Sequence, residues 1–223
     1  MFYNAEHYAD PTAGAAEYRE NRNARARVRA SSKKEKATMN AGKRFEADWK
    51  ASVPKDVWYY RLRDSPGSFY GGAQDGVRFT TDNICDCLLY SCPVLCLTEL
   101  KTTDKRSAPL ADMFGRYDPE KRRYKKQKHL EAMAAAAQHP GAVSVVVINY
   151  RRTGHTYAVS AAKVLGFIDG AIWGTEPKSI SESWCEGAGI RVPQHQLKVN
   201  WRYDLGVLIR ALREKEAIKW RTN

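Results

Sequence analysis

The sequence lacks the features of a secreted or membrane-bound protein. None of its stretches reaches the ~20 consecutive apolar residues that a membrane-spanning helix needs. Its first residues, MFYNAEHYAD, do not show the basic and then apolar order of a signal peptide, and no internal repeat is visible. We therefore expect a cytoplasmic protein that does not bind membranes, and 223 residues are enough for one well-formed core.

Cysteine is also scarce, and five is an odd number, which disfavours a disulfide framework. Four of the cysteines lie between positions 85 and 96, so a zinc site has to be considered. Their spacing, C-x-C-x4-C-x3-C, is not a usual zinc pattern, and strand alternation would point Cys85 and Cys87 away from Asp86. We interpret these cysteines as small core residues, with zinc as the alternative.

Acidic residues are too few to balance the basic ones, with 25 Asp and Glu against 37 Lys and Arg and a net charge of +12. This excess favours an anionic partner, nucleic acid first, although a generically basic surface is the alternative. Basic residues are densest between Arg19 and Lys36, and blocks of like charge stay extended until a polyanion neutralises them. We expect residues 1–38 to be a flexible arm that binds DNA, or else a solubility tail. The arm residues that we assign to DNA contact are Arg25, Arg27 and Arg29.

Two short apolar runs, 84–90 and 94–100, have the composition of strands and carry charged residues. The first run contains Asp86, and a Glu-x-Lys sequence, Glu99 and Lys101, ends the second. Because alternate side chains of a strand point to opposite faces, Glu99 and Lys101 share one face.

Whether Asp86 joins them depends on the register of the two strands. Directly opposed residues of an antiparallel pair share a face, so Asp86 opposes Glu99 if the turn is centred between Cys92 and Pro93. A bulge would spoil this register. Two carboxylates and an ammonium group would then meet on one face of the hairpin.

Such a group of charges suits phosphodiester hydrolysis. Two neighbouring carboxylates repel each other unless a cation lies between them, and Mg²⁺ prefers one or two carboxylates together with water and phosphate oxygens. A neighbouring lysine can orient a water molecule or stabilise developing charge. The alternative is an edge strand in which Glu99 and Lys101 are an ordinary surface ion pair.

The remaining patterns predict an α/β (α+β) fold, a mixed sheet with helices packed on it. The helix predicted over 120–138 is basic in its first half, which we expect to meet phosphates, a solvated face being the alternative. The Gly-rich stretch 65–76 is a loop of functional length. We predict the other helices over 40–50, 161–168, 179–187 and 203–220, and the other strands over 57–62, 142–150 and 156–160.

Taken in order, several of these residues resemble the RecU-type Holliday junction resolvases, in their phage-like branch, of the PD-(D/E)xK nuclease superfamily. The resemblance spans roughly residues 40–163 and includes the interval from Asp86 to Glu99. The segments that carry it are Asn40-x-Gly42-x-x-x-Glu46, Thr80-Thr81…Asp86, Glu99-x-Lys101, Gln127-x-x-x-Glu131-x-Met133 and Thr156-Tyr157.

The resemblance implies a restriction-endonuclease-like sheet over residues 39–175, with 176–223 as a C-terminal helical extension packed on it. It also implies a homodimeric, Mg²⁺- or Mn²⁺-dependent endonuclease without an organic cofactor, which nicks branched double-stranded DNA symmetrically during recombination and repair, in a bacterial or phage-infected cell. The implied catalytic residues are Asp86, Glu99, Lys101, Glu46 and Gln127, with Asp86, Glu99 and Glu46 as metal ligands. The further DNA contacts that we assign are Lys43, Arg78, Thr80, Thr81, Arg122, Arg123, Lys125 and Lys126.

Alternatives stay open for several of these residues. The alternative for Glu46 is a solvent-facing helix carboxylate, and for Gln127 an ordinary helix surface residue. His129 and His155 would suit general bases, but this metal chemistry needs no histidine. For the whole protein, the alternatives are a non-catalytic DNA-binding protein and a related nuclease with another DNA substrate.

Overall fold

The computed structural model describes residues 41–62 and 83–222, with side chains described up to residue 215. The predictions for the basic arm and for the Gly-rich loop fall outside these ranges. The assigned DNA contacts that lie outside them are Arg25, Arg27, Arg29, Arg78, Thr80 and Thr81. Residues Arg44–Asn223 form one compact unit, and the fold described below is the fold of this unit.

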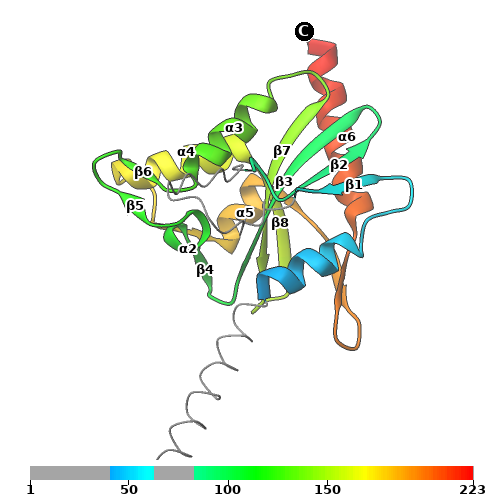
Figure 1. Cartoon of the computed structure of the whole chain (residues 1–223), viewed down its shortest axis with the longest axis horizontal. Helices are drawn as coiled ribbons and strands as arrows, with labels where there is room; N and C mark the ends of the chain where they lie inside the picture. The colour runs from blue at the N-terminus through cyan, green and yellow to red at the C-terminus, as the bar shows by residue number, and fades with distance from the viewer. Residues whose placement is uncertain (1–40, 63–82, 223) are drawn as a thin grey trace, which may run out of the picture. The chain divides into compact units, whose positions relative to one another are not determined.

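A six-stranded mixed sheet organises the unit (Figure 1). Its third and fourth strands run parallel, and every other neighbouring pair is antiparallel. In spatial order the strands are β1 (Trp58–Arg61), β2 (Cys87–Ser91), β3 (Val94–Thr103), β7 (Ala142–Tyr150), β8 (His155–Ser160) and β10 (Ile190–Arg191). Three small antiparallel pairs are β4 (Ser107–Pro109) with β9 (Ser179–Ser181), β5 (Tyr117–Asp118) with β6 (Arg123–Tyr124), and β11 (Gln194–Gln196) with β12 (Trp201–Tyr203).

Helices cover both faces of the sheet. The α3–α4 face carries α2 (Leu110–Phe114), α3 (Gln127–Ala136), α4 (Ala161–Trp173) and α5 (Glu182–Ala188). The α6 face carries the helix of residues 41–50 and α6 (Leu205–Thr222). Alternate residues of the central strands enter the two cores, so that Val146 and Ile148 lie in the first, and Val145 and Val147 in the second.

This architecture confirms the predicted fold class, an α+β fold with a mixed sheet flanked by helices. The strand predicted over 142–150 is confirmed as β7, which begins and ends at the predicted residues. The helix predicted over 40–50 is confirmed over residues 41–50, and it buries Phe45 and Trp49. No helix within residues 41–62 and 83–222 combines the length and the apolarity that crossing a bilayer requires.

The helix predicted over 120–138 is wrong in its first part, because α3 begins only at Gln127. The preceding residues form the β5–β6 hairpin, in which Tyr117 pairs with Tyr124. Asp118 explains this departure, since its Oδ1 accepts hydrogen bonds from the backbone N–H groups of Glu120 and Lys121 and so favours a turn over a helix. The basic residues expected on a helix therefore lie on a hairpin.

Residues 176–223, expected as a helical extension, also supply strands. Besides α5 and α6, they contribute β10 to the edge of the main sheet, where Ile190 pairs with Ala158 of β8. The short helix predicted over 179–187 is α5, preceded by β9, and Ser181 caps it by accepting a hydrogen bond from the N–H of Trp184. This segment therefore completes the sheet as well as covering it.

Candidate active site

The β2–β3 hairpin has the predicted turn centre, but its paired residues end at Cys87 and Thr98, one position short of Asp86 and Glu99. Ser91 pairs with Val94 and Cys87 with Thr98, so the turn is centred between Cys92 and Pro93 as predicted.

The regular alternation of side chains along the first strand, however, starts at Cys87 and not at residue 84 as predicted. β2 begins at Cys87, and the N–H of Asp86 donates instead to the carbonyl oxygen of Thr98, at 3.1 Å. Cys85 consequently lies in the core on the α3–α4 face and Cys87 in the core on the α6 face, so the prediction that both point away from Asp86 is wrong. Cys85, Cys87 and Cys96 are buried core residues as predicted, whereas Cys92 is exposed.

Three charged side chains meet beside β3. One oxygen of Asp86, Oδ2, accepts a hydrogen bond of 2.7 Å from the backbone N–H of Leu100, which stands between Glu99 and Lys101. The Lys101 ammonium contacts Glu99 Oε1 at 2.5 Å, and these two side chains are only 15% and 10% exposed. Since Leu97 lies in the core on the α3–α4 face, alternation places Glu99 and Lys101 on that face as well.

Burial and a like charge act together on Asp86. Burial raises the pKa of the Asp86 carboxyl above its ordinary value, and the negative charge of Glu99 raises it further. Lys101, the N–H of Leu100 and Lys126 oppose the rise. The crowding of two acids in a partly water-excluded place is therefore only partly relieved by their neighbours.

Lys126 belongs to this site through the tertiary structure. It immediately precedes α3 and acts on the pKa of Asp86, although the sequence marked it only as one basic residue in a DNA-binding run. We call Asp86, Glu99, Lys101 and Lys126 the charged cluster. In the sequence, Lys126 is one of several basic residues in the first half of the stretch 120–138. This pattern indicates a basic surface, but it does not indicate which of these residues acts on the acids.

Glu46 is not brought to the acids. It lies on the helix of residues 41–50, which packs on the α6 face through Phe45 and Trp49, and its carboxylate pairs with Arg61 of β1. Within the part of the chain that the structure describes, no group of three or more His, Cys, Asp and Glu residues is arranged to hold a metal ion. The structure thus supplies two neighbouring carboxylates and not the expected three.

Gln127 is buried and makes its contacts within the protein. Its Oε1 accepts a hydrogen bond from the N–H of Tyr124 at 3.2 Å, and its Nε2 donates to Asp169 of α4 at 3.5 Å. These contacts join the end of the β5–β6 hairpin to the start of α3 and to α4. Gln127 therefore fixes the backbone next to Lys126, and the described contacts do not place it on the acids.

The chemistry of Asp86 and Glu99 fits a hard divalent cation. Carboxylate oxygens are preferred ligands of Mg²⁺, and an ion that keeps several waters or phosphate oxygens needs only one or two of them from the protein. A cation at this place would also remove the repulsion that raises the pKa of Asp86.

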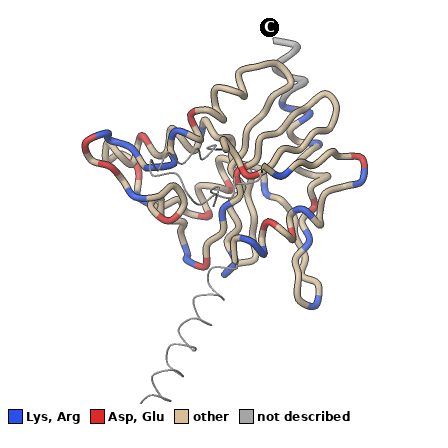
Figure 2. Tube along the Cα trace, viewed as in Figure 1, with Lys and Arg blue, Asp and Glu red and all other residues tan. Residues whose placement is uncertain are grey.

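Basic residues gather on the β5–β6 hairpin (Figure 2). They line a hollow of about 480 Å³ that includes Arg116, Lys121, Arg123 and Lys125. Arg122 makes a different contact, since its guanidinium lies over the ring of Trp173, 5.0 Å from the centroid. Lys43 is exposed on the helix of residues 41–50.

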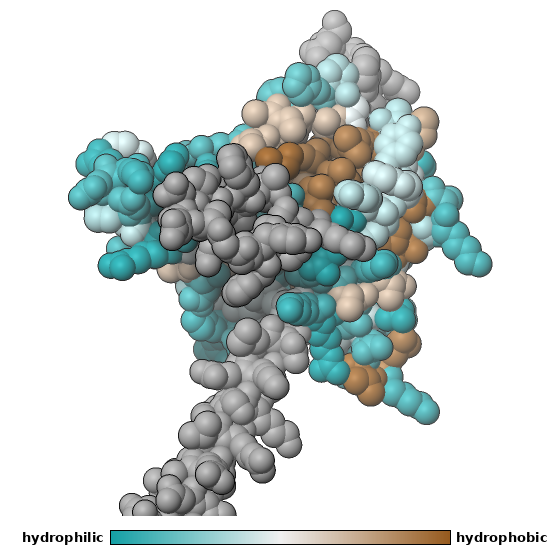
Figure 3. All heavy atoms as spheres, viewed as in Figure 1, coloured by the Kyte–Doolittle hydropathy of each residue, from teal (hydrophilic) through white to brown (hydrophobic). Residues whose placement is uncertain are grey.

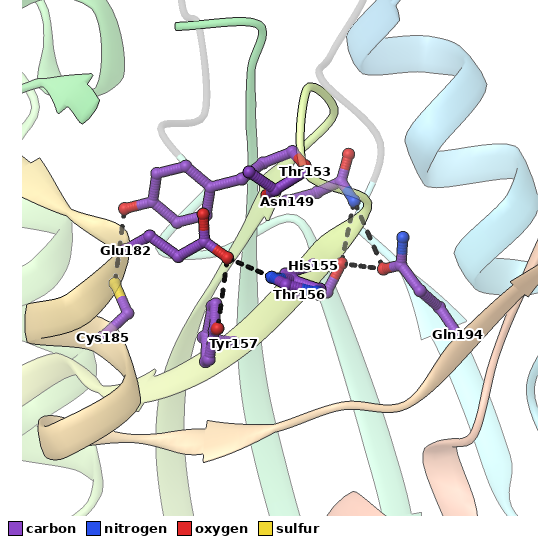
Figure 4. A network of polar contacts seen from close by, with 9 residues as sticks. Asn149, Thr153, His155, Thr156, Tyr157, Glu182, Cys185 and Gln194 are labelled. Carbon is purple, nitrogen blue, oxygen red and sulfur yellow. Dashed lines mark hydrogen bonds and ion pairs between the residues drawn. The ribbon is translucent and has the colours of Figure 1, made fainter. Parts of the chain in front are cut away.

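A second polar network, which the sequence did not reveal, lies around β8 (Figure 4). The Glu182 carboxylate contacts Nδ1 of His155 and accepts a hydrogen bond from the Tyr157 hydroxyl at 3.2 Å. Beside it, the Asn149 side chain donates to Thr156 Oγ1 at 2.8 Å, and Thr156 donates to Gln194. His155 is thus a partner of Glu182 in this network and lies outside the charged cluster.

Comparisons with known proteins leave the family open. No family model matches the sequence, and no curated protein matches it. Among solved structures, the fold is similar to Hjc of Archaeoglobus fulgidus, a Holliday junction resolvase from an archaeal hyperthermophile. The two share 17% sequence identity with a TM-score of 0.37, over 67% of this chain and 94% of that one.

Proposed function

We propose that this protein is a metal-dependent, structure-selective endonuclease that cuts branched DNA. The observation that carries the proposal is the charged cluster, in which two acids crowd together, Lys101 pairs with Glu99 and the charge of Lys126 acts on Asp86. Buried like charges are costly to maintain, and perturbed carboxyl groups of this kind concentrate at functional sites. Hydrolysis of a phosphodiester is the chemistry that these groups fit best.

In this proposal Asp86 and Glu99 hold Mg²⁺ or Mn²⁺. When bound, such an ion supplies positive charge to the scissile phosphate and lowers the pKa of water. Lys101, already beside Glu99 at 2.5 Å, orients the attacking water or stabilises the charge that develops on the phosphate. Lys126 adds a second cation from the α3 side, and Gln127 keeps the backbone next to it in place.

Affinity for the DNA backbone comes from other residues. The hairpin hollow with Arg116, Arg123 and Lys125 presents several cations to phosphates, and such contacts bind DNA without reading its sequence. We also assign Lys43 and the basic arm to contacts with DNA, on the basis of their charge. The resemblance of the sequence motifs to RecU-type resolvases supports a four-way junction as the substrate, and a cytoplasmic homodimer that makes two symmetric nicks in recombination.

One observation favours a non-catalytic DNA-binding protein instead. Glu99 is already paired with Lys101, and Glu46 is paired with Arg61 rather than with the acids. A cluster that is only structural would keep these pairs in the presence of Mg²⁺ and DNA.

Incubation with a mobile four-way junction, with and without Mg²⁺, decides between these functions. We expect paired nicks only with Mg²⁺, and no cutting by the Asp86→Asn variant, which should still bind the junction. A linear duplex of the same sequence is the control, because equal cutting of both DNAs would point to a nuclease with another substrate. Absence of any divalent-dependent cutting would leave the non-catalytic function.

A further inference from the structure

Three large aromatic side chains are exposed at the β1 edge of the sheet. Trp58 is 53% exposed, Tyr60 51% and Tyr90 43%. The rings of Trp58 and Tyr60 are stacked, with centroids 5.7 Å apart and planes 6° from parallel. Tyr90 of β2 stands directly opposite Trp58. We call these three residues the aromatic strip.

The strip lies on the same face of the sheet as the charged cluster. Tyr60 is opposite Leu88, and Leu88 is opposite Leu97 of β3, so these three side chains share one face. Leu97 is two residues from Glu99, which therefore lies on this face too. The intervening residues, such as Tyr59, turn to the core on the α6 face.

The strip lies two strands away from Glu99 and runs away from it. Tyr60 pairs through Leu88 with Leu97, which is two residues or about 7 Å along β3 from Glu99, and the two strand spacings add about 10 Å sideways. Trp58 pairs through Tyr90 with Leu95, which is four residues or about 13 Å along β3 from Glu99. The strip therefore lies within reach of the nucleotides next to a phosphate held at the acids.

The helices of this face leave the strip uncovered. α3 and α4 contribute to the core beneath β7 and β8, whereas hydrophobic residues remain on the surface over the β1–β3 side of the sheet (Figure 3), where Trp58, Tyr60 and Tyr90 are exposed. An exposed apolar patch of this kind marks a binding surface more often than chance. Because the strip shares this face of the sheet with Glu99 and Lys101, the partner that it binds is expected to be the molecule that enters the cluster.

We propose that the aromatic strip stacks unpaired bases of the DNA strand next to the phosphate held at Asp86 and Glu99. This inference rests on the proposed nuclease function and names the substrate class, DNA with unstacked bases beside the cut. Parallel exposed rings suit bases, since every base has a π face and stacking tolerates any sequence. The lysines of the cluster and the net charge of +12 favour a polyanion over an apolar protein partner.

The consequence is a structural preference for DNA. In a continuous duplex both faces of each base are covered by its neighbours, so the rings have nothing to bind. At a branch point, or in a single strand, a base can leave the stack and lie on an aromatic side chain. The strip would thus select branched or single-stranded DNA where the backbone contacts of the hairpin do not.

The test uses the full chain with Asp86→Asn, so that the DNA stays intact. The Trp58→Leu/Tyr60→Leu double variant removes both rings but keeps apolar side chains, and Trp58→Phe/Tyr60→Phe is the matched control that keeps a ring at each place. Affinities are measured for a dT oligonucleotide, for a four-way junction carrying 2-aminopurine at the branch, and for a blunt duplex. We expect the Leu variant to lose about tenfold or more in affinity for the oligonucleotide and the junction. The Phe variant should stay within about twofold, and duplex affinity should not change in either.

An unchanged oligonucleotide affinity in the Leu variant, or an equal loss for the blunt duplex, would overturn the inference. So would a change of the Leu variant from dimer to monomer in sedimentation, because the strip would then be a contact between two copies of the chain. Failure of the proposed function is seen separately, as absence of cutting by the unmodified protein. Ring-dependent binding of the oligonucleotide does not depend on that result.

Discussion

This protein has two buried or half-buried carboxylate sites, Asp86 with Glu99 and Glu182 with His155. Their surroundings shift the pKa of Asp86 and the pKa of Glu182 in opposite directions. Burial raises the pKa of Glu182, but hydrogen bonds from His155, Thr153 and Tyr157 outweigh it and leave that pKa below its ordinary value. At Asp86 the balance is reversed, because burial and the charge of Glu99 outweigh the neighbouring cations and the pKa is raised. The fold thus satisfies one carboxylate with its own donors and leaves the other crowded.

This difference separates a structural site from a candidate reactive one. A carboxylate that receives several hydrogen bonds from its own protein stabilises the fold and has little left to offer a ligand. Two acids forced together gain most when a cation binds, so the fold bears a cost that a ligand relieves. The comparison therefore predicts that substitutions at Asp86 or Glu99 affect catalysis most, whereas substitutions at Glu182 affect stability most.

The largest expected difference is in catalysis. Glu99→Gln should lower the rate of junction nicking by about 10³-fold or more, since it removes one of two acids from the charged cluster. Glu182→Gln, which makes the same chemical change in the other network, should keep the rate within a few fold. Initial rates under single-turnover conditions measure both, and an equal loss in the two variants would break the comparison.

Stability should change in the opposite order. Glu182→Ala should lower the free energy of unfolding by about 1–2 kcal/mol, because His155 and the Tyr157 hydroxyl lose their shared acceptor. Asp86→Asn should leave the free energy of unfolding unchanged or raise it, because it removes the repulsion with Glu99. Urea unfolding curves measure both values. A strongly destabilised Asp86→Asn variant would mean that Asp86 is a structural residue.

The pH dependence of stability should also have opposite signs. The pKa of Glu182 is lowered below 4.5, so the advantage of the native protein over Glu182→Gln should be present above pH 4.5 and lost as the pH falls through the folded pKa. The pKa of Asp86 is raised above 3.8, so its disadvantage against Asp86→Asn should be absent below pH 3.8 and grow as the pH rises through the folded pKa. Unfolding curves between pH 3 and 7 test this without DNA or metal. If the stability difference between the native protein and its variant changed with pH in the same direction at both sites, the contrast between Glu182 and Asp86 would be wrong.

The smallest expected effect is on DNA affinity, and it compares a basic residue that is open to a ligand with one that is held by the protein. Arg123 lines the hollow of the β5–β6 hairpin, whereas the neighbouring Arg122 is held over Trp173. Arg123→Ala should weaken DNA binding a few fold and reduce the slope of log affinity against log salt by about one. Arg122→Ala should change that slope less. Binding titrations at several salt concentrations would show whether the two variants are instead indistinguishable.

Much of the fold could be predicted because its signals are local. The continuous apolar run 142–150 predicts β7, and the turn at Cys92 and Pro93 predicts the register in which Ser91 pairs with Val94 and Cys87 with Thr98. The helix expected over 120–126 failed for an equally local reason, since Asp118 takes up the N–H groups of Glu120 and Lys121. Propensity favoured a helix there, and a hydrogen-bonding side chain decided against it.

The sequence by itself determined the order of the elements, the alternation that puts Glu99 and Lys101 on one face, and the excess of positive charge. Only the tertiary structure decided which distant side chains meet. It pairs Glu46 with Arg61, joins His155 to Glu182 and brings the charge of Lys126 within range of Asp86. The physical reason is that propensity and alternation act over a few residues, whereas these meetings depend on how whole helices pack against the two faces of a sheet.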